Sequence, residues 1–162
     1  MSALAKTLSD YGEYHRDHRN VLTHAVGVPL IVLAVTTLLA RPEIAVFGKA
    51  ITPALVLGGI AAIYYTLLDF RFGMLMTLLL AAFLFVGHQI ASVSTLAWLG
   101  GGVALFVVGW AFQFLGHHWE GRKPAFIDDI KSLLVGPLFM LAEGLFALGL
   151  AKGLKKEVEA LD

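Results

Sequence analysis

The sequence predicts an all-α integral membrane protein, built as a helical bundle of about five hydrophobic helices with an amphipathic helix at the N-terminus. Of its 162 residues, 58% are hydrophobic and only 15% are charged, whereas soluble domains have roughly 45–50% apolar and about 25% charged residues. The mean hydropathy is +0.79, and the charged residues leave long uncharged intervals between them. These intervals show no alternation of apolar and polar residues, which favours helices over a membrane barrel.

Charge and cysteine content narrow the functional class. Twelve Lys and Arg residues balance twelve Asp and Glu residues, so no basic excess is available to neutralise a phosphate backbone, and we expect no nucleic-acid partner. The chain has no cysteine, which excludes disulfides, thiolate metal sites and cysteine nucleophiles. Six histidines, together with carboxylates and amides, remain as candidate metal ligands and catalytic groups.

The uncharged intervals locate the elements along the chain. Residues 1–20 form a polar segment with apolar residues at helical spacing, which we expect to lie along the membrane surface and not to be a cleaved signal peptide. A membrane-spanning helix needs about 20 apolar residues, and the intervals yield five hydrophobic segments: 21–40, 50–68, 72–91, 95–116 and 133–151, the last of which contains Glu143. A turn at 92–95 divides the longest interval.

The whole chain, 1–162, is expected to be one membrane domain. The hydrophobic helices occupy 21–151, and 152–162 form a polar tail. We expect a multi-pass protein of a bacterial inner membrane or of the endoplasmic reticulum, surrounded by membrane lipids. A homodimer is compatible with the sequence.

Two polar segments lie at helix ends. Residues 14–24 enter the first hydrophobic helix and residues 113–120 leave the fourth. Three connections separate these two helix ends, so the topology brings them to the same side of the membrane. Residues four or seven apart share a helix face, which predicts a stripe of Asn20 and His24 on one helix and a stripe of Gln113, His117 and Glu120 on the other.

Imidazole and carboxylate groups that gather at one membrane depth favour a metal site, for which iron, zinc, copper and nickel are all suitable. A simpler interpretation places four histidines in the polar interfacial layer without any ligand: His15, His18, His117 and His118. His24 and Gln113 lie deeper in their helices and are harder to explain in this way. Glu143, inside the last helix, either supports the site or is a neutral, hydrogen-bonded carboxyl group.

Several short motifs also point to a family. They are Tyr14-His15, Asn20, His24, Gly27-Val28-Pro29, Gln113 to His117, Glu120 to Ala125, Gly136 to Phe139, and Glu143. In these motifs the chain resembles a family of small multi-spanning membrane proteins whose fungal member is a 2-hydroxy fatty acid dioxygenase of the endoplasmic reticulum that acts in phytosphingosine breakdown. The resemblance covers nearly the whole chain, but between about 40 and 110 mainly hydrophobicity is shared.

The resemblance implies an Fe(II)-dependent dioxygenase that uses dioxygen to shorten a 2-hydroxy fatty acid by one carbon, in an α-oxidation at the membrane interface. Carried over position by position, it implies metal ligands at His15, His24, His117 and His118. The same comparison implies catalytic roles close to the iron for Asn20, Gln113 and Glu120. Basic residues at the boundary are candidates for binding the substrate carboxylate, namely Arg19, Arg122 and Lys123.

Two other classes of protein remain as alternatives. Di-iron membrane hydroxylases and desaturases resemble one another in carrying about eight histidines, whereas this chain has six. A non-catalytic protein that binds lipid or metal, or a small channel that uses Glu143, is the other alternative. The short chain and the lack of a convincing inverted repeat argue against a transporter.

Overall fold

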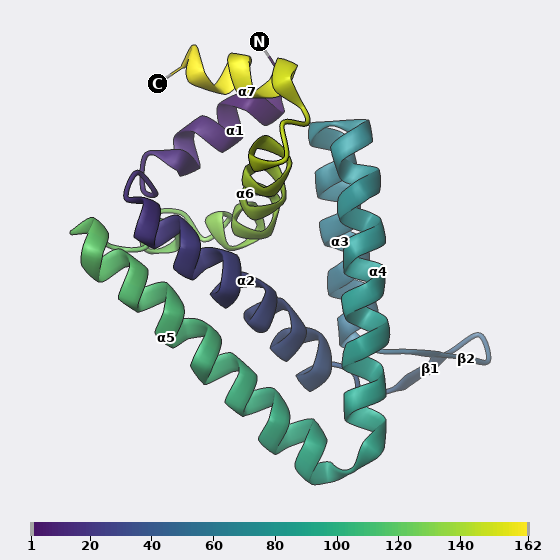
Figure 1. Cartoon of the computed structure of the whole chain (residues 1–162). Helices are drawn as coiled ribbons and strands as arrows, with labels where there is room; N and C mark the ends of the chain where they lie inside the picture. The colour runs from purple at the N-terminus through teal and green to yellow at the C-terminus, as the bar shows by residue number, and fades with distance from the viewer. Residues whose placement is uncertain (1, 162) are drawn as a thin grey trace. The chain divides into compact units, whose positions relative to one another are not determined.

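A computed structural model describes residues 2–161, and helices dominate this range (Figure 1). In chain order the elements are α1 (Ala3–Gly12), α2 (His18–Leu38), β1 (Ile44–Val46), β2 (Lys49–Ile51), α3 (Pro53–Leu68), α4 (Phe70–Val93), the π-helical turn η1 (Leu96–Gly101), α5 (Gly102–Glu120), the 3-10 turn η2 (Ala125–Ile127), α6 (Ser132–Ala147) and α7 (Lys152–Glu159). The prediction of an all-α bundle is confirmed, because the short β1–β2 pair is the only sheet in the part of the chain that the structure describes.

Each of the five predicted hydrophobic segments contains a helix. Three helices are long and apolar enough to cross a membrane, namely α2, α4 and the continuous stretch Leu96–Glu120 formed by η1 and α5. Helices α6 and α7 pass the same test only as a pair, and a bend of 113° separates them. Helix α3 has 16 residues and is shorter than the length that a perpendicular span requires.

The chain divides into two compact units. The first combines Met1–Val28 with Ala111–Asp162, and the second is Pro29–Trp110. Helix α2 therefore begins in the first unit and ends in the second, whereas α5 begins in the second and ends in the first. The expectation of one membrane domain over 1–162 stays a prediction.

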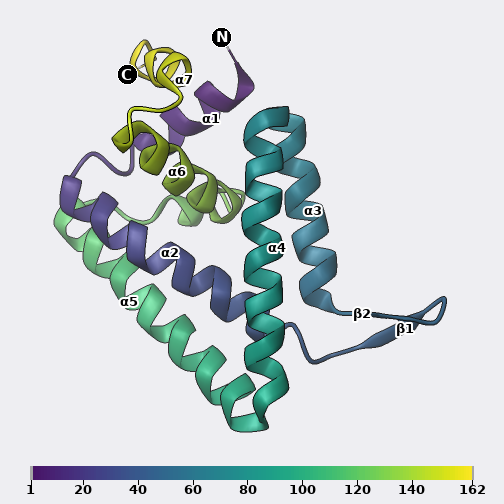
Figure 2. The ribbon, with the colours of Figure 1, turned by 45° about the vertical axis from the view of Figure 1, so that its right-hand side comes forward.

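In the second unit, α3 and α4 lie side by side (Figures 1 and 2). Asp69 joins them, because its backbone N–H donates to the carbonyl of Tyr65 at 3.1 Å and its Oδ1 accepts from the N–H of Phe72 at 2.8 Å. At Gly73 the helices touch through their backbones, since a Cβ there would lie 2.3 Å from the Cα of Thr66. Small residues permit this close approach between helices.

The predicted turn between the third and fourth hydrophobic segments is present. Helix α4 ends at Val93, and Ser94 and Thr95 precede η1. Arg41 braces this turn by donating from Nε to the carbonyl of Ala91 and from Nη1 to Oγ1 of Thr95, each at 2.9 Å.

One element of the second unit was not predicted. Strands β1 and β2 form an antiparallel hairpin in which Ile44 pairs with Ile51. Its two turn residues, Phe47 and Gly48, have φ angles of 50° and 74°, which suits the twist of a two-residue hairpin. Phenylalanine is rare at positive φ, so this turn carries little of the usual sequence signal.

In the first unit, α1 packs on α6 and α7. The amphipathic character of α1 is confirmed, because Leu4, Leu8 and Tyr11 form a buried stripe. Protein covers this stripe, and the expectation that the segment lies along the membrane surface stays a prediction. The tail that was predicted to be polar forms α7, and Ser2 donates from its backbone N and its Oγ to Glu157 at 3.0 and 2.9 Å.

Candidate metal centre

Three histidines from separate elements meet inside the first unit. His15 lies between α1 and α2, His24 lies in the second turn of α2, and His117 lies in the last turn of α5. Their exposed fractions are 5%, 1% and 6%, and one ring nitrogen of each lies within 4.8 Å of the other two. The two polar segments that topology predicted to meet therefore do meet, and they form a histidine triad that can hold a metal ion.

Hydrogen bonds settle which nitrogens face one another. Nδ1 of His15 lies 2.9 Å from the carbonyl oxygen of Tyr11, and Nδ1 of His24 lies 2.9 Å from that of Asn20. A carbonyl can only accept, so each Nδ1 carries the proton and each neutral ring keeps its lone pair on Nε2. The two Nε2 atoms are 3.1 Å apart, and two lone pairs at this separation repel unless a cation or a further proton lies between them.

A metal ion fits this arrangement better than a proton does. Burial lowers the pKa of His15 to about 4, against the opposing effects of its hydrogen bond to Tyr11 and the charge of Glu120, so its ring is neutral at pH 7. Two nitrogens that each lie about 2.0–2.1 Å from one ion are about 2.9–3.4 Å apart. The donor set of three imidazoles is suited to a divalent transition metal.

Glu120 fastens the loop that carries His15 to the end of α5. Its carboxylate accepts three hydrogen bonds, from the backbone N–H of Arg16 (3.0 Å), the backbone N–H of Asp17 (2.8 Å) and Nδ2 of Asn20 (3.1 Å). Asn20 is fully buried and its Nδ2 also donates to the carbonyl of Tyr14 at 3.2 Å. Asn20 and Glu120 thus lie beside the triad, as expected, and their side chains tie its supporting backbone together.

Two aromatic residues that were not singled out for the site pack against it. The ring of Tyr11 stacks on His15 with centroids 4.3 Å apart and planes 14° apart. The ring centroid of Phe139, in α6, lies 5.5 Å from that of His15 and 5.1 Å from that of Tyr11. The spacing of four between Tyr11 and His15 was the available signal for the first contact, whereas the contact with α6 depends on tertiary packing.

The other predicted site residues lie outside the triad. His118 and the three candidate carboxylate-binding cations are all exposed. Each cation already has a partner: Arg19 pairs with Asp17 at 2.8 Å, Arg122 lies over the ring of Tyr14 and donates to the carbonyl of Glu13, and Lys123 pairs with Asp128. Gln113, in contrast, is buried, and its Nε2 has no hydrogen-bond partner within the described residues.

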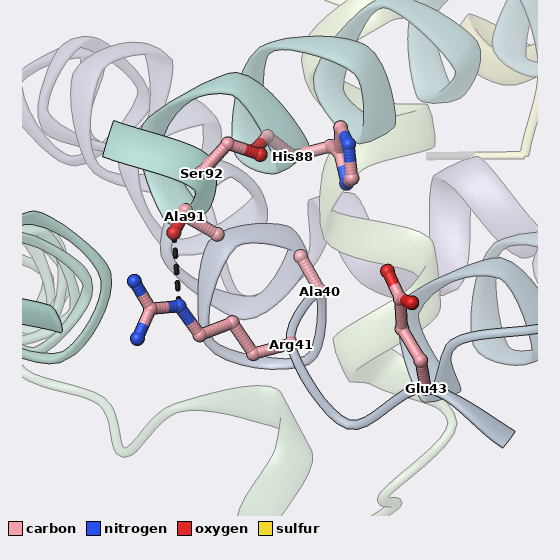
Figure 3. A pocket seen from close by; sticks show the side chains of 6 residues that line it. All are labelled: Ala40, Arg41, Glu43, His88, Ala91 and Ser92. Atoms are coloured by element: carbon pink, nitrogen blue, oxygen red, sulfur yellow. Dashed lines mark hydrogen bonds between the residues drawn. The ribbon is translucent and has the colours of Figure 1, made fainter. Parts of the chain in front are cut away.

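A pocket in the second unit gathers other polar groups. It has a volume of about 320 Å³ and is lined by Ala40, Arg41, Glu43, His88, Ala91 and Ser92. Figure 3 shows His88 and Glu43 on one side of Ala40 and the guanidinium of Arg41 on the other. Only His88 and Glu43 among these residues carry typical metal-binding groups. Within residues 2–161, the triad is the only cluster of three or more His, Cys, Asp or Glu side chains close enough to share an ion.

The fold and the triad define a helical protein with apolar helices of membrane-spanning length and a buried site suited to a metal ion. Comparison with known proteins gives the family. The family described as 2-hydroxy-palmitic acid dioxygenase Mpo1-like matches residues 1–148. The 2-hydroxy-palmitic acid dioxygenase MPO1 of Saccharomyces cerevisiae is 36% identical over 160 residues, which cover 96% of this chain and 87% of the yeast protein. The chain belongs to the Mpo1-like family. No solved structure matches it.

Proposed function

We propose that this protein is an Fe(II)-dependent dioxygenase that shortens 2-hydroxy fatty acids by one carbon. The observation that carries the proposal is the pair of facing, unprotonated Nε2 atoms of His15 and His24, 3.1 Å apart, with His117 beside them. Membership of a family named for a 2-hydroxy-palmitic acid dioxygenase supports the choice of substrate and reaction.

The reaction balances without a further reductant. A 2-hydroxy acid and one molecule of dioxygen contain the atoms and electrons of the shortened acid, carbon dioxide and water. The bond between the carboxyl carbon and carbon 2 breaks, and carbon 2 becomes the new carboxyl group. An iron ion held by the three histidines would supply the Lewis acidity and the activation of dioxygen that this reaction needs.

The chain's own residues prepare the site for this chemistry. His15, His24 and His117 would hold the ion, and their burial keeps bulk water away. Glu120 and Asn20 hold the loop that carries His15. The triad lies at the ends of α2 and α5, which are apolar helices of spanning length, so a fatty acid would place its head group at the histidines, in a multi-pass protein surrounded by lipid.

Metal analysis and oxygen uptake test the proposal together. We expect protein purified without oxygen to hold about one iron per chain and to consume oxygen with 2-hydroxypalmitate. His24→Ala and His117→Ala should lose the iron and the activity. His118→Ala is the matched control, because His118 is the same residue type, neighbours His117 and is exposed; it should keep both.

The possible results separate the alternatives. Unchanged iron content in His24→Ala or His117→Ala would contradict the ligand assignment. Two irons per chain would favour a di-iron hydroxylase. Zinc or no metal, with no oxygen uptake, would favour a non-catalytic protein that binds lipid or metal.

A further inference from the structure

We propose that Gln113 determines specificity for the 2-hydroxyl group, by donating a hydrogen bond from Nε2 to the hydroxyl oxygen of the substrate. This inference rests on the proposed function, because it assigns a role within the same site. Gln113 is the buried residue of the polar stripe on α5 whose side-chain amide donor has no partner in the described part of the chain.

The position of Gln113 on α5 follows from its neighbours. The face of α5 that meets the start of α2 includes Gly116, which abuts Asn20 and Thr23, and His117. Gln113 precedes His117 by four residues and therefore lies on the same face, one turn or about 6 Å further toward the middle of the helix. The amide thus belongs to the face that carries the triad, on its apolar side.

The burial of this amide calls for a partner. Only 6% of Gln113 is exposed, and native proteins leave few buried donors unsatisfied. An oxygen atom of a bound molecule would satisfy Nε2. A neutral amide suits a neutral hydroxyl group, since this pair places no unpaired charge in an apolar region.

The order of groups along the substrate selects the hydroxyl oxygen. If the tail of the acid runs toward the middle of α5, carbon 2 and its hydroxyl group lie nearer the middle of the helix than the carboxylate does. Gln113 likewise lies nearer the middle of α5 than His117, so its amide is at the depth of the hydroxyl group. A site that hydrogen-bonds a substrate hydroxyl rejects an analogue without it, so Gln113 would distinguish 2-hydroxypalmitate from palmitate.

Binding measurements without oxygen test this role. We would measure the dissociation constants of 2-hydroxypalmitate and palmitate for the iron-loaded protein, its Gln113→Met variant and a Gln89→Met control on the exposed part of α4. Methionine keeps the length of the side chain and removes the donor. We expect Gln113→Met to keep its iron and its affinity for palmitate, and to bind 2-hydroxypalmitate about tenfold more weakly. Gln113→Leu provides a second apolar variant if the first does not fold.

Three results would overturn the inference. They are an unchanged preference for the hydroxy acid, an equal loss of affinity for both acids, and a loss of iron from Gln113→Met, which would indicate a role in supporting the triad. Failure of the proposed function is distinguishable, because the unmodified iron-loaded protein would then neither bind nor oxidise 2-hydroxypalmitate.

Discussion

Replacing Gly116 with alanine should separate the start of α2 from the end of α5 and so disrupt the histidine triad. A Cβ at this position would lie 2.2 Å from Oδ1 of Asn20 and 2.2 Å from Oγ1 of Thr23, whereas ordinary contact begins at 3.4 Å. Either the side chains of Asn20 and Thr23 must rotate away, or the two helix ends must move apart by up to about 1.2 Å, the difference between these distances. Neither neighbour can easily move, because Asn20 is fully buried and Thr23 donates to the carbonyl of Asn20 at 2.8 Å.

The expected effect can be estimated from two opposing contributions. Overpacking a tight contact costs about 1–3 kcal/mol, and exchanging glycine for alanine in a helix returns up to about 1 kcal/mol. With the full gain, the net loss in the free energy of unfolding is up to about 2 kcal/mol relative to the unmodified protein, and about 1–3 kcal/mol relative to a glycine-to-alanine exchange without the overlap. The same movement displaces His117 from His24, and disturbances around metal ligands typically weaken metal binding by about 10- to 100-fold.

Thermal unfolding and competitive metal titration of the purified variant would measure both effects. Gly144→Ala is the matched control, since Gly144 lies in α6 and a Cβ there would meet nothing within 4 Å. The control should be as stable as the unmodified protein or slightly more stable. If Gly116→Ala matched the control in both stability and metal affinity, the close approach of α2 and α5 would not support the triad.

Three further predictions concern the metal and its surroundings. Glu120→Gln keeps only one side-chain oxygen for the three donors, so its metal dissociation constant should rise at least about tenfold; an unchanged constant in a chelator competition would contradict the role of Glu120. In metal-free protein, the pKa of His15 is about 4 in the folded state, against 6.5 for the ordinary group. The unfolded state therefore binds a proton more readily, so the contribution of neutral His15 to the free energy of unfolding is complete above pH 6.5 and is lost as the pH falls toward 4. Melting curves should show the free energy of unfolding falling in this range, on the order of 3 kcal/mol for His15, and a slope unchanged in His15→Gln would refute this cause. Removal of the metal by a chelator should lower the melting temperature, since an ion at 100 times its dissociation constant stabilises the folded state by about 2.7 kcal/mol; equal melting curves with and without metal would show that the folded protein does not bind it.

The meeting of the two polar segments could be predicted because it depends on topology and helical periodicity alone. The number of apolar segments between His24 and His117 places these residues on one side, and the spacing of Asn20 from His24 and of His117 from Glu120 gives each helix one polar face. In the structure the two segments meet, and Nδ2 of Asn20 from one donates to the carboxylate of Glu120 from the other.

Individual ligands could not be chosen in this way. His117 and His118 are adjacent in the sequence, yet the first is buried in the triad and the second is exposed, because the orientation of α5 depends on which face meets α2. The sequence also did not predict that the candidate carboxylate-binding cations pair with other groups of the protein. Lys123 and Asp128, for example, form an ion pair only once the loop after α5 is folded.

The sequence by itself determined an all-α protein with apolar helices and a polar site at the ends of two of them, since hydrophobic periods and charge gaps act locally along the chain. Only the tertiary structure decided which nitrogens face one another, that Glu120 secures the loop of His15, and that α1 is covered by protein. These features depend on distances of a few ångströms between residues about a hundred positions apart, which close packing determines and local patterns do not contain.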